Sequence, residues 1–217
     1  MEYIHNTEQF QFHNTVVALG KFDGMHKGHQ LIFDELIQYK QMGYQAAVFS
    51  FDRPPLNMLK HKHMRVIYTT NEKIKLLARR GIDIYIEHPF TDEFSHLSPE
   101  DFVIKVLLEK TGMKVLVVGD DCGFGYKRQG NVELLERMSK EYDFKLIVIP
   151  KLELEGEIVS STRIRRLLSE GKVEEANRLM EDPFMICGPV VHGNHMGAEV
   201  LQMPTANQIP LEDKLLP

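Results

Sequence analysis

The sequence lacks the features that mark secreted, membrane-embedded and disulfide-built proteins. It contains two cysteines, Cys122 and Cys187, and neither stands in a paired-cysteine motif, so we expect reduced thiols and no thiolate-held zinc. No apolar run is long enough to span a bilayer. The N-terminus has neither the basic nor the apolar region of an export signal. We therefore expect a cytoplasmic protein without a membrane segment.

A basic excess is missing as well. The net charge is −5 and the pI is near 6.1, which argues against a general nucleic-acid binder but leaves room for a local basic pocket. There is no internal repeat and no low-complexity segment. The 217 residues, 43% hydrophobic and 26% charged, are sufficient for one well-buried domain with a remainder.

What the sequence does contain is an alternation of strand-like and helix-like segments. Continuous apolar runs predict strands at 15–19, 44–51, 82–88, 114–119 and 144–150. Helical spacing and capping residues predict helices at 28–42, 70–81, 98–112, 131–142, 160–171 and 172–181, with Thr70 or Asn71 and then Ser98 as N-caps. This pattern is typical of a doubly wound, mostly parallel α/β sheet covered on both faces. Ligands then bind beyond the carboxyl ends of strands, here after Leu19, Phe51 and Val118.

The character of the chain changes after Pro183. The remaining residues are rich in glycine, proline and short apolar runs. We therefore predict a first domain over 1–183 and the start of a β-rich unit over 184–217. About thirty residues are too few for an independent core, so this tail either packs on the first domain or begins a second one.

Two histidines three residues apart follow the first predicted strand, in GKFDGMHKGH (20–29). The neighbouring glycines let a ligand approach the backbone, and the helix that begins near Gly28 offers free N–H groups. Imidazoles placed there can donate hydrogen bonds to phosphate oxygens. A zinc site is disfavoured because no third ligand stands at the usual spacing. The simplest alternative is a glycine-rich turn with two solvated histidines.

Two further segments carry candidate binding groups. In VSSTRIRRLL (159–168), hydroxyl groups precede Arg163, Arg165 and Arg166, which suits a polyphosphate or, equally, a capped helix with a solvated basic face. In GDDCGFGYKRQGN (119–131), aromatic and cationic side chains share a loop that could hold a planar anionic ligand. The alternative for this segment is an ordinary polar loop.

Taken together, these motifs resemble a known family. GKFDGMHKGH is similar to the G-x-F-D-G-x-H-x-G-H form of the H-x-G-H signature of class I nucleotidyltransferases, typical of bacterial bifunctional riboflavin kinase/FMN adenylyltransferases, or FAD synthetases. VSSTRIR resembles the family's S-S-T-R-I-R motif, and GDDCGFGYKRQGN its G-x-D-F-R-F-G-x-x-R-x-G motif. GPVVHG and PTAN resemble the join to the riboflavin kinase module.

The resemblance implies a Rossmann-like nucleotidyltransferase fold that moves AMP from ATP to the phosphate of FMN, giving FAD and pyrophosphate by direct attack. It implies Mg²⁺ carried by the ATP phosphates, without metal ligands from the protein in this domain. The implied catalytic residues are His26, His29, Ser161, Thr162 and Arg165. The implied ATP-binding residues are Gly20, Phe22, Asp23, Gly24, Gly28, Ser160 and Arg163. The implied FMN-binding residues are Asp121, Phe124, Gly125 and Arg128.

The sequence also departs from the family. Cys122 and Gly123 replace an aromatic residue and an arginine in the flavin loop, and the P-H-P region reads Arg53-Pro54-Pro55. On the kinase side, GAEVLQMPTAN keeps Thr205 and Asn207, which match positions that hold magnesium and nucleotide phosphate, but it has lost an arginine, a glycine and an aromatic residue. The downstream catalytic glutamate has no counterpart. We therefore expect no riboflavin kinase activity from these residues.

Two alternatives to an FMN adenylyltransferase stay open at this point. The same fold could serve another phosphorylated acceptor, such as phosphopantetheine or nicotinate mononucleotide, which the altered loop at Cys122 and Gly123 permits. The chain could also be a non-catalytic regulator that binds flavin or nucleotide. The two histidines and the complete S-S-T-R-I-R run argue against the regulator.

Overall fold

A computed structural model describes residues 1–52, 65–191 and 207–217. Its centre is a six-stranded sheet in the order β1-β4-β3-β2-β5-β6, with every neighbouring pair parallel. The strands are β1 (Glu2–His5), β2 (Thr15–Leu19), β3 (Gln45–Phe51), β4 (Ile84–His88), β5 (Met113–Gly119) and β6 (Lys145–Ile149). The predicted doubly wound α/β fold is confirmed, and the five strands expected from the sequence are all present.

The order of the strands determines where a ligand can bind. From β2 the chain proceeds to β3 and β4 on one side, and it later crosses back to place β5 and β6 on the other side. The chain that leaves the carboxyl end of β2 therefore leads toward β3, and the chain that leaves the carboxyl end of β5 leads the opposite way, toward β6. Such a switch point opens a crevice at the edge of the sheet. The loops after Leu19 and after Gly119 both start there.

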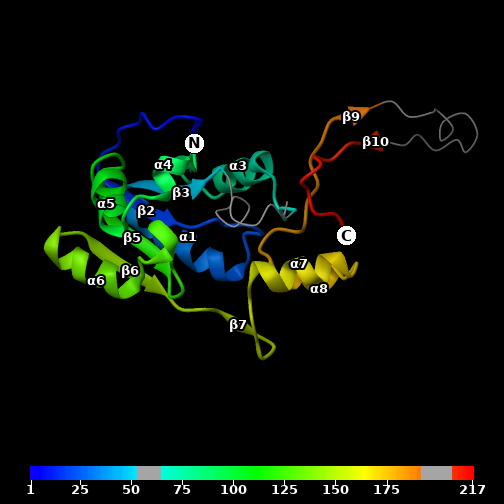
Figure 1. Ribbon diagram of the computed structural model, residues 1–217. Coiled ribbons are helices and arrows are strands. Elements are labelled where there is room, and N and C mark those ends of the chain that lie inside the picture. The colour runs from blue at the N-terminus through cyan, green and yellow to red at the C-terminus, as the bar shows by residue number, and fades with distance from the viewer. Residues whose placement is uncertain (53–64, 192–206) are drawn as a thin grey trace, which may run out of the picture.

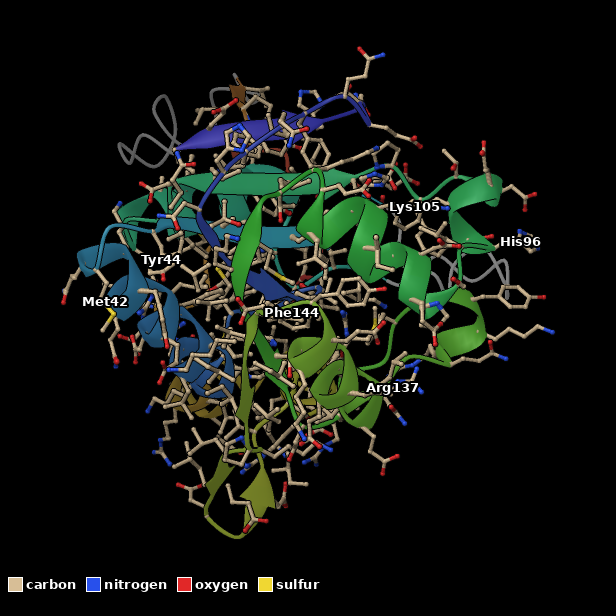
Figure 2. All side chains as sticks on the ribbon, turned by 90° about the vertical axis from the view of Figure 1, so that its left-hand side faces the viewer. Met42, Tyr44, His96, Lys105, Arg137 and Phe144 are labelled. Atoms are coloured by element: carbon tan, nitrogen blue, oxygen red, sulfur yellow. The ribbon has the colours of Figure 1, made fainter. Side chains whose placement is uncertain are left out.

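Helices cover both faces of the sheet (Figure 1). One face carries α1 (Lys27–Gln41), α3 (Thr70–Arg79), α7 (Ser161–Ser169) and α8 (Val173–Leu179). The other carries α5 (Pro99–Asp101), the π-helix η1 (Phe102–Leu108) and α6 (Val132–Glu141). Successive strand residues alternate between the two cores, so all five residues of β2 are buried. In Figure 2, Phe144 lies against the body of the protein, whereas Met42 at the end of α1 projects outward and is 69% exposed.

Two predicted helices differ from the structure in detail. The N-cap of α3 is Thr69, not Thr70 or Asn71, because Thr69 forms a reciprocal capping box with Glu72. Ser98 caps the next helix as predicted, but the helix widens into the π form from Phe102 to Leu108. No sequence pattern predicts β1 or the short elements α4 (Asp92–Ser95), η2 (Tyr126–Arg128), β7 (Glu153–Leu154) and β8 (Glu157–Ile158).

The C-terminal segment both starts a β-rich unit and packs on the first domain. The strands β9 (Val190–Val191) and β10 (Asn207–Gln208) pair antiparallel, and beyond them the chain runs back to the main body (Figure 1). There the Val66 amide donates to the Asp213 carbonyl over 2.7 Å, and the Leu215 amide donates to the Val66 carbonyl over 2.8 Å. The predictions for Arg53, Pro54, Pro55 and Thr205 fall outside the described residues.

Candidate active site

The loop between β2 and α1 folds back on itself at the switch point. The ring of Phe22 lies 2.9 Å from the place that a Cβ of Gly20 would occupy, so only glycine fits there. Phe22 itself is 2% exposed, and its ring meets His29 edge to face at 5.2 Å. Gly20 and Phe22 therefore shape the site from inside the core, and Phe22 supports His29 rather than lining an open pocket.

His26 and His29 lie at the start of α1 with their rings stacked, the centroids 3.6 Å apart. His26 is the N-cap, and its Nδ1 accepts a hydrogen bond from the His29 amide at 3.3 Å. An accepting Nδ1 carries no proton, so the proton of a neutral His26 is on Nε2. Gly28 makes room for this arrangement, since a Cβ there would lie 3.2 Å from the His26 ring.

Both imidazoles are neutral at physiological pH. Burial lowers the pKa of His26 to about 4. Burial, with the nearby His26, lowers the pKa of His29 well below its usual value of 6.5. The Nδ1 of His29 is buried without a hydrogen-bond partner among the described residues, which favours Nε2 as its protonated nitrogen. The pair thus offers neutral N–H donors in a water-poor setting, where hydrogen bonds to developing charge are strongest.

The N-terminus of α7 is fastened to the same loop. Ser161 donates its hydroxyl to the Asp23 carbonyl over 2.6 Å, and the guanidinium of Arg165 forms an ion pair with the Asp23 carboxylate. Ser160 caps the helix by accepting from the Arg163 amide, and Thr162 is exposed beside it. The structure therefore brings the S-S-T-R-I-R motif to the histidine motif, as the resemblance implied.

Asp23 also binds a segment that the sequence did not single out. Its Oδ1 accepts from the amides of Ile67 and Tyr68 at 3.0 and 3.1 Å. Arg165 donates to the Arg65 carbonyl over 2.6 Å. Gly24, at φ +82°, lies so close to Ile67 that a Cβ would come within 3.0 Å of it. Residues 65–68 enter the site through backbone groups, which leave no side-chain signature in the sequence.

Arg163 does not join the histidines. Its guanidinium donates to the Leu154 carbonyl at 3.1 Å and pairs with Glu157 at 3.1 Å, both in the β7–β8 hairpin. Its side chain is 13% exposed. Arg163 thus anchors the hairpin, and its contact with ATP stays a prediction. An open hollow next to the hairpin is lined by Arg163 itself and by Arg166, Ser160 and Thr162, together with hairpin residues.

The loop after β5 carries the predicted flavin residues, and they divide into two groups. Asp121 lies close enough to His26 to act on its pKa, and the guanidinium of Arg128 packs on Gly123, where a Cβ would lie 2.8 Å from its Nε. Phe124 is different: it is 5% exposed and packs against Phe102 in the core, so its predicted contact with FMN is not supported. Burial raises the pKa of the Cys122 thiol to about 11, which makes it unreactive.

Lys21 is a site residue that the sequence reasoning passed over. Lys21 is exposed at the surface, and partial desolvation, followed by the charges of Arg128 and Arg165, lowers its pKa. The three cations come from three different elements and gather at the carboxyl ends of β2 and β5. The signal was available, because a lysine stands within the histidine motif between Gly20 and Phe22.

Gly125 has a structural task, which a substitution can test. It has φ +69°, and a Cβ would lie 2.7 Å from the Cα of Pro99. Gly125→Ala is expected to lower the free energy of unfolding by about 1–3 kcal/mol or more, from backbone strain plus this clash. The control is Gly156→Ala, with φ +76° and no neighbour within 4 Å, which carries the strain alone. Urea unfolding measures both, and equal losses would contradict a role for the Pro99 contact.

Comparison with known proteins identifies the family. A profile described as FAD synthetase matches residues 8–163, and one described as riboflavin kinase matches residues 180–217. The chain belongs to the FAD synthetase family. The first match spans the histidine loop, strands β2 to β6 and the start of α7. The second begins after α8 and contains β9, β10 and the segment that packs on Val66.

Relatives of this FAD synthetase family member cover nearly all of it. A bifunctional riboflavin kinase/FMN adenylyltransferase of Buchnera aphidicola subsp. Schizaphis graminum is 39% identical over 94% of this chain and 66% of its own length. A FAD synthetase of Listeria monocytogenes is 32% identical over 87% of this chain and 77% of its own. A solved structure described as a macrolide-efflux protein from Streptococcus pneumoniae has a TM-score of 0.85 at 30% identity, over 99% of this chain and 70% of that one. The chain thus spans about two thirds of the length of the bifunctional relative.

The described part of the chain has neither a metal-ligand cluster nor a membrane-crossing helix. In residues 1–52, 65–191 and 207–217, no three His, Cys, Asp or Glu side chains lie together in a way that could hold a metal ion. Across the same ranges, no helix has the length and apolar character needed to cross a membrane.

Proposed function

We propose that this FAD synthetase family member transfers the adenylyl group of ATP to the phosphate of FMN, giving FAD and pyrophosphate. The observation that carries the proposal is the pair of stacked, neutral histidines at the N-terminus of α1, with the N-terminus of α7 fastened beside them at the switch point. Membership of the family supplies the substrates. The chain would act in the cytoplasm, with residues 1–183 as the transferase and residues 184–217 as a kinase-like segment.

The chemistry requires positioning and charge stabilisation rather than a covalent intermediate. His26 and His29 would donate Nε2–H hydrogen bonds to oxygens on the α-phosphorus as negative charge grows there. Lys21, Arg128 and Arg165 would supply the positive potential that attracts two anionic substrates. Mg²⁺ would arrive on the ATP phosphates and neutralise part of their charge. The described residues fit this arrangement, since they offer cations and N–H donors to the ATP phosphates.

The N-terminus of α7 would bind the leaving pyrophosphate. Ser160, Ser161 and Thr162 stand where the free N–H groups and the positive dipole end of this helix are available. Arg165 would exchange part of its bond to Asp23 for a phosphate oxygen. On the other side of the crevice, Asp121, Gly125 and Arg128 would flank the attacking FMN.

A single assay tests this function. Purified protein with ATP, Mg²⁺ and FMN is expected to release FAD and pyrophosphate in equal amounts, measured by chromatography and a coupled pyrophosphate assay. Riboflavin in place of FMN is expected to give no FMN, because the kinase-like segment has lost an arginine, a glycine and an aromatic residue. Pyrophosphate release with phosphopantetheine or nicotinate mononucleotide, and none with FMN, would replace FMN as the acceptor. Binding of FMN and ATP without turnover would favour the regulator.

A further inference from the structure

The C-terminal residues that match riboflavin kinase reach into the first domain through one buried lysine. The side chains of Lys214 and Glu72 are both 0% exposed, and Nζ lies 2.7 Å from Oε2. Nζ also donates to the carbonyls of Ile67 and Met185, at 2.5 and 2.8 Å. It lies 4.9 and 4.5 Å from the ring centroids of Tyr68 and Phe184. A buried charge with this many partners is costly to disrupt, since any lost partner leaves another group unpaired.

Lys214 is part of a longer contact. Val66 is bonded through both its N–H and its C=O, to Asp213 and Leu215. Glu72 uses its other oxygen to accept from the Cys187 amide at 2.7 Å. The two parts of the C-terminal segment therefore converge on the chain between Val66 and Glu72.

Residues 65–68, called the strip below, also contact the candidate active site on their other side. Asp23 accepts from the amides of Ile67 and Tyr68, and Arg165 donates to the Arg65 carbonyl. Residues 65–68 therefore have the transferase loop on one side and the C-terminal segment on the other. The strip has backbone bonds in both directions, so a shift on one side changes the geometry on the other.

We propose that Lys214 is a positioning residue of the transferase, which fixes residues 65–68 and, through them, Asp23 and Arg165. The residues that match riboflavin kinase would then complete the neighbouring site, in addition to beginning a second module. This inference rests on the proposed function for its kinetic readout, and its structural readout is independent of it.

The test compares the buried Lys214 with Lys40, a lysine that is 38% exposed and also bonds one carboxylate and one carbonyl. Lys214→Met removes the bonds to Glu72 and to the carbonyls of Ile67 and Met185. The control Lys40→Met removes a bond to Asp83 and one to the Gly81 carbonyl, both at 2.6 Å, at the amino ends of the strands and away from the site. A second test variant, Lys214→Met with Glu72→Gln, avoids leaving a buried carboxylate unpaired, so that a folded protein is obtained.

Hydrogen exchange is the readout that does not require turnover. In both Lys214 variants, the amides of Ile67 and Tyr68 are expected to exchange about tenfold faster or more, because the strip loses its outer support. In Lys40→Met they should exchange as in the unaltered chain. Unchanged protection of these amides in the folded double variant would overturn the proposal, whatever the activity of the protein.

The kinetic readout follows on the same proteins, below their melting temperatures. The KM for ATP is expected to rise about tenfold in the Lys214 variants, with a smaller change in kcat, since a misplaced Asp23–Arg165 pair weakens the phosphate site. Lys40→Met should keep the KM for ATP. Faster exchange at Ile67 and Tyr68 with no change in this KM would limit Lys214 to a structural role and overturn its positioning role. If the unaltered chain makes no FAD, the exchange result still decides whether Lys214 supports the strip.

Discussion

Replacing His29 with alanine is expected to lower kcat for FAD formation by about a hundredfold or more, with little change in FMN binding. The ring is stacked on His26 at 3.6 Å and is supported from the side by Phe22, so its position is well defined. Its neutral state leaves one N–H to donate, and an N–H aimed at the developing charge on the α-phosphorus acts mainly in the transition state. The loss should therefore fall on kcat rather than on substrate affinity.

The measurement is steady-state turnover, with FMN binding followed separately by calorimetry. Since His29 lies in a stacked pair, thermal melting must first show that the variant is folded. His29→Gln keeps an amide N–H at a similar distance along the side chain and is expected to retain more activity than alanine. The control is His13→Ala, an exposed histidine just before β2 at the other end of that strand. Near-normal turnover in folded His29→Ala would refute the proposed role.

Much of the fold could be predicted because of how parallel sheets bury their strands. The segments that became β2 and β5 contain continuous apolar runs, since both of their faces are covered, and β4 is buried throughout although it ends in Glu87 and His88. The edge strand β1 has exposed ends and a partly buried middle, so Glu2–His5 carries no such run. Its register on β4 is set by tertiary contacts. The β7–β8 hairpin has two residues per strand, too few for any periodicity.

The sequence motifs predicted which segments form the candidate site, but they did not predict where the individual side chains point. Arg163 and Arg165 are two residues apart on one helix, about 200° around its axis, so they point to different sides. Arg165 faces Asp23, and Arg163 faces the hairpin. The sequence motif alone does not show which of the two arginines faces the site, because that depends on how α7 packs on the sheet.

The flavin loop shows the same limit. Phe124 and Arg128 carry equal weight in a sequence motif, but the backbone bridge between Phe124 and Gly130 turns the aromatic ring into the core. Gly123 leaves the space over which the Arg128 guanidinium lies. The arginine that the family motif places at position 123 would meet that guanidinium. The glycine at position 123 therefore permits the position that Arg128 takes here.

Acidification from pH 7 to pH 5 is expected to lower the free energy of unfolding by about 2 kcal/mol through His26 alone. The pKa of His26 is about 4 in the folded protein and near 6.5 when the chain is unfolded. Below pH 6.5 the unfolded chain therefore binds a proton that the folded protein does not bind. Acid favours unfolding over this range, and the loss stops near pH 4, where the folded protein also takes up the proton. His29, whose pKa is lowered in the same direction, adds to the slope.

His26→Asn isolates this contribution. Asparagine is a strong N-cap whose side-chain oxygen can accept from the His29 amide, as Nδ1 of His26 does, but it does not titrate. Urea unfolding at pH 7 and pH 5 gives the loss for each protein, and carboxylates common to both cancel in the difference. The variant is expected to lose about 2 kcal/mol less than the parent chain over this interval. Equal losses would mean that His26 takes up its proton in the folded state near its ordinary pKa of about 6.5, so that it would meet ATP as a cation below that pH and not as a neutral donor.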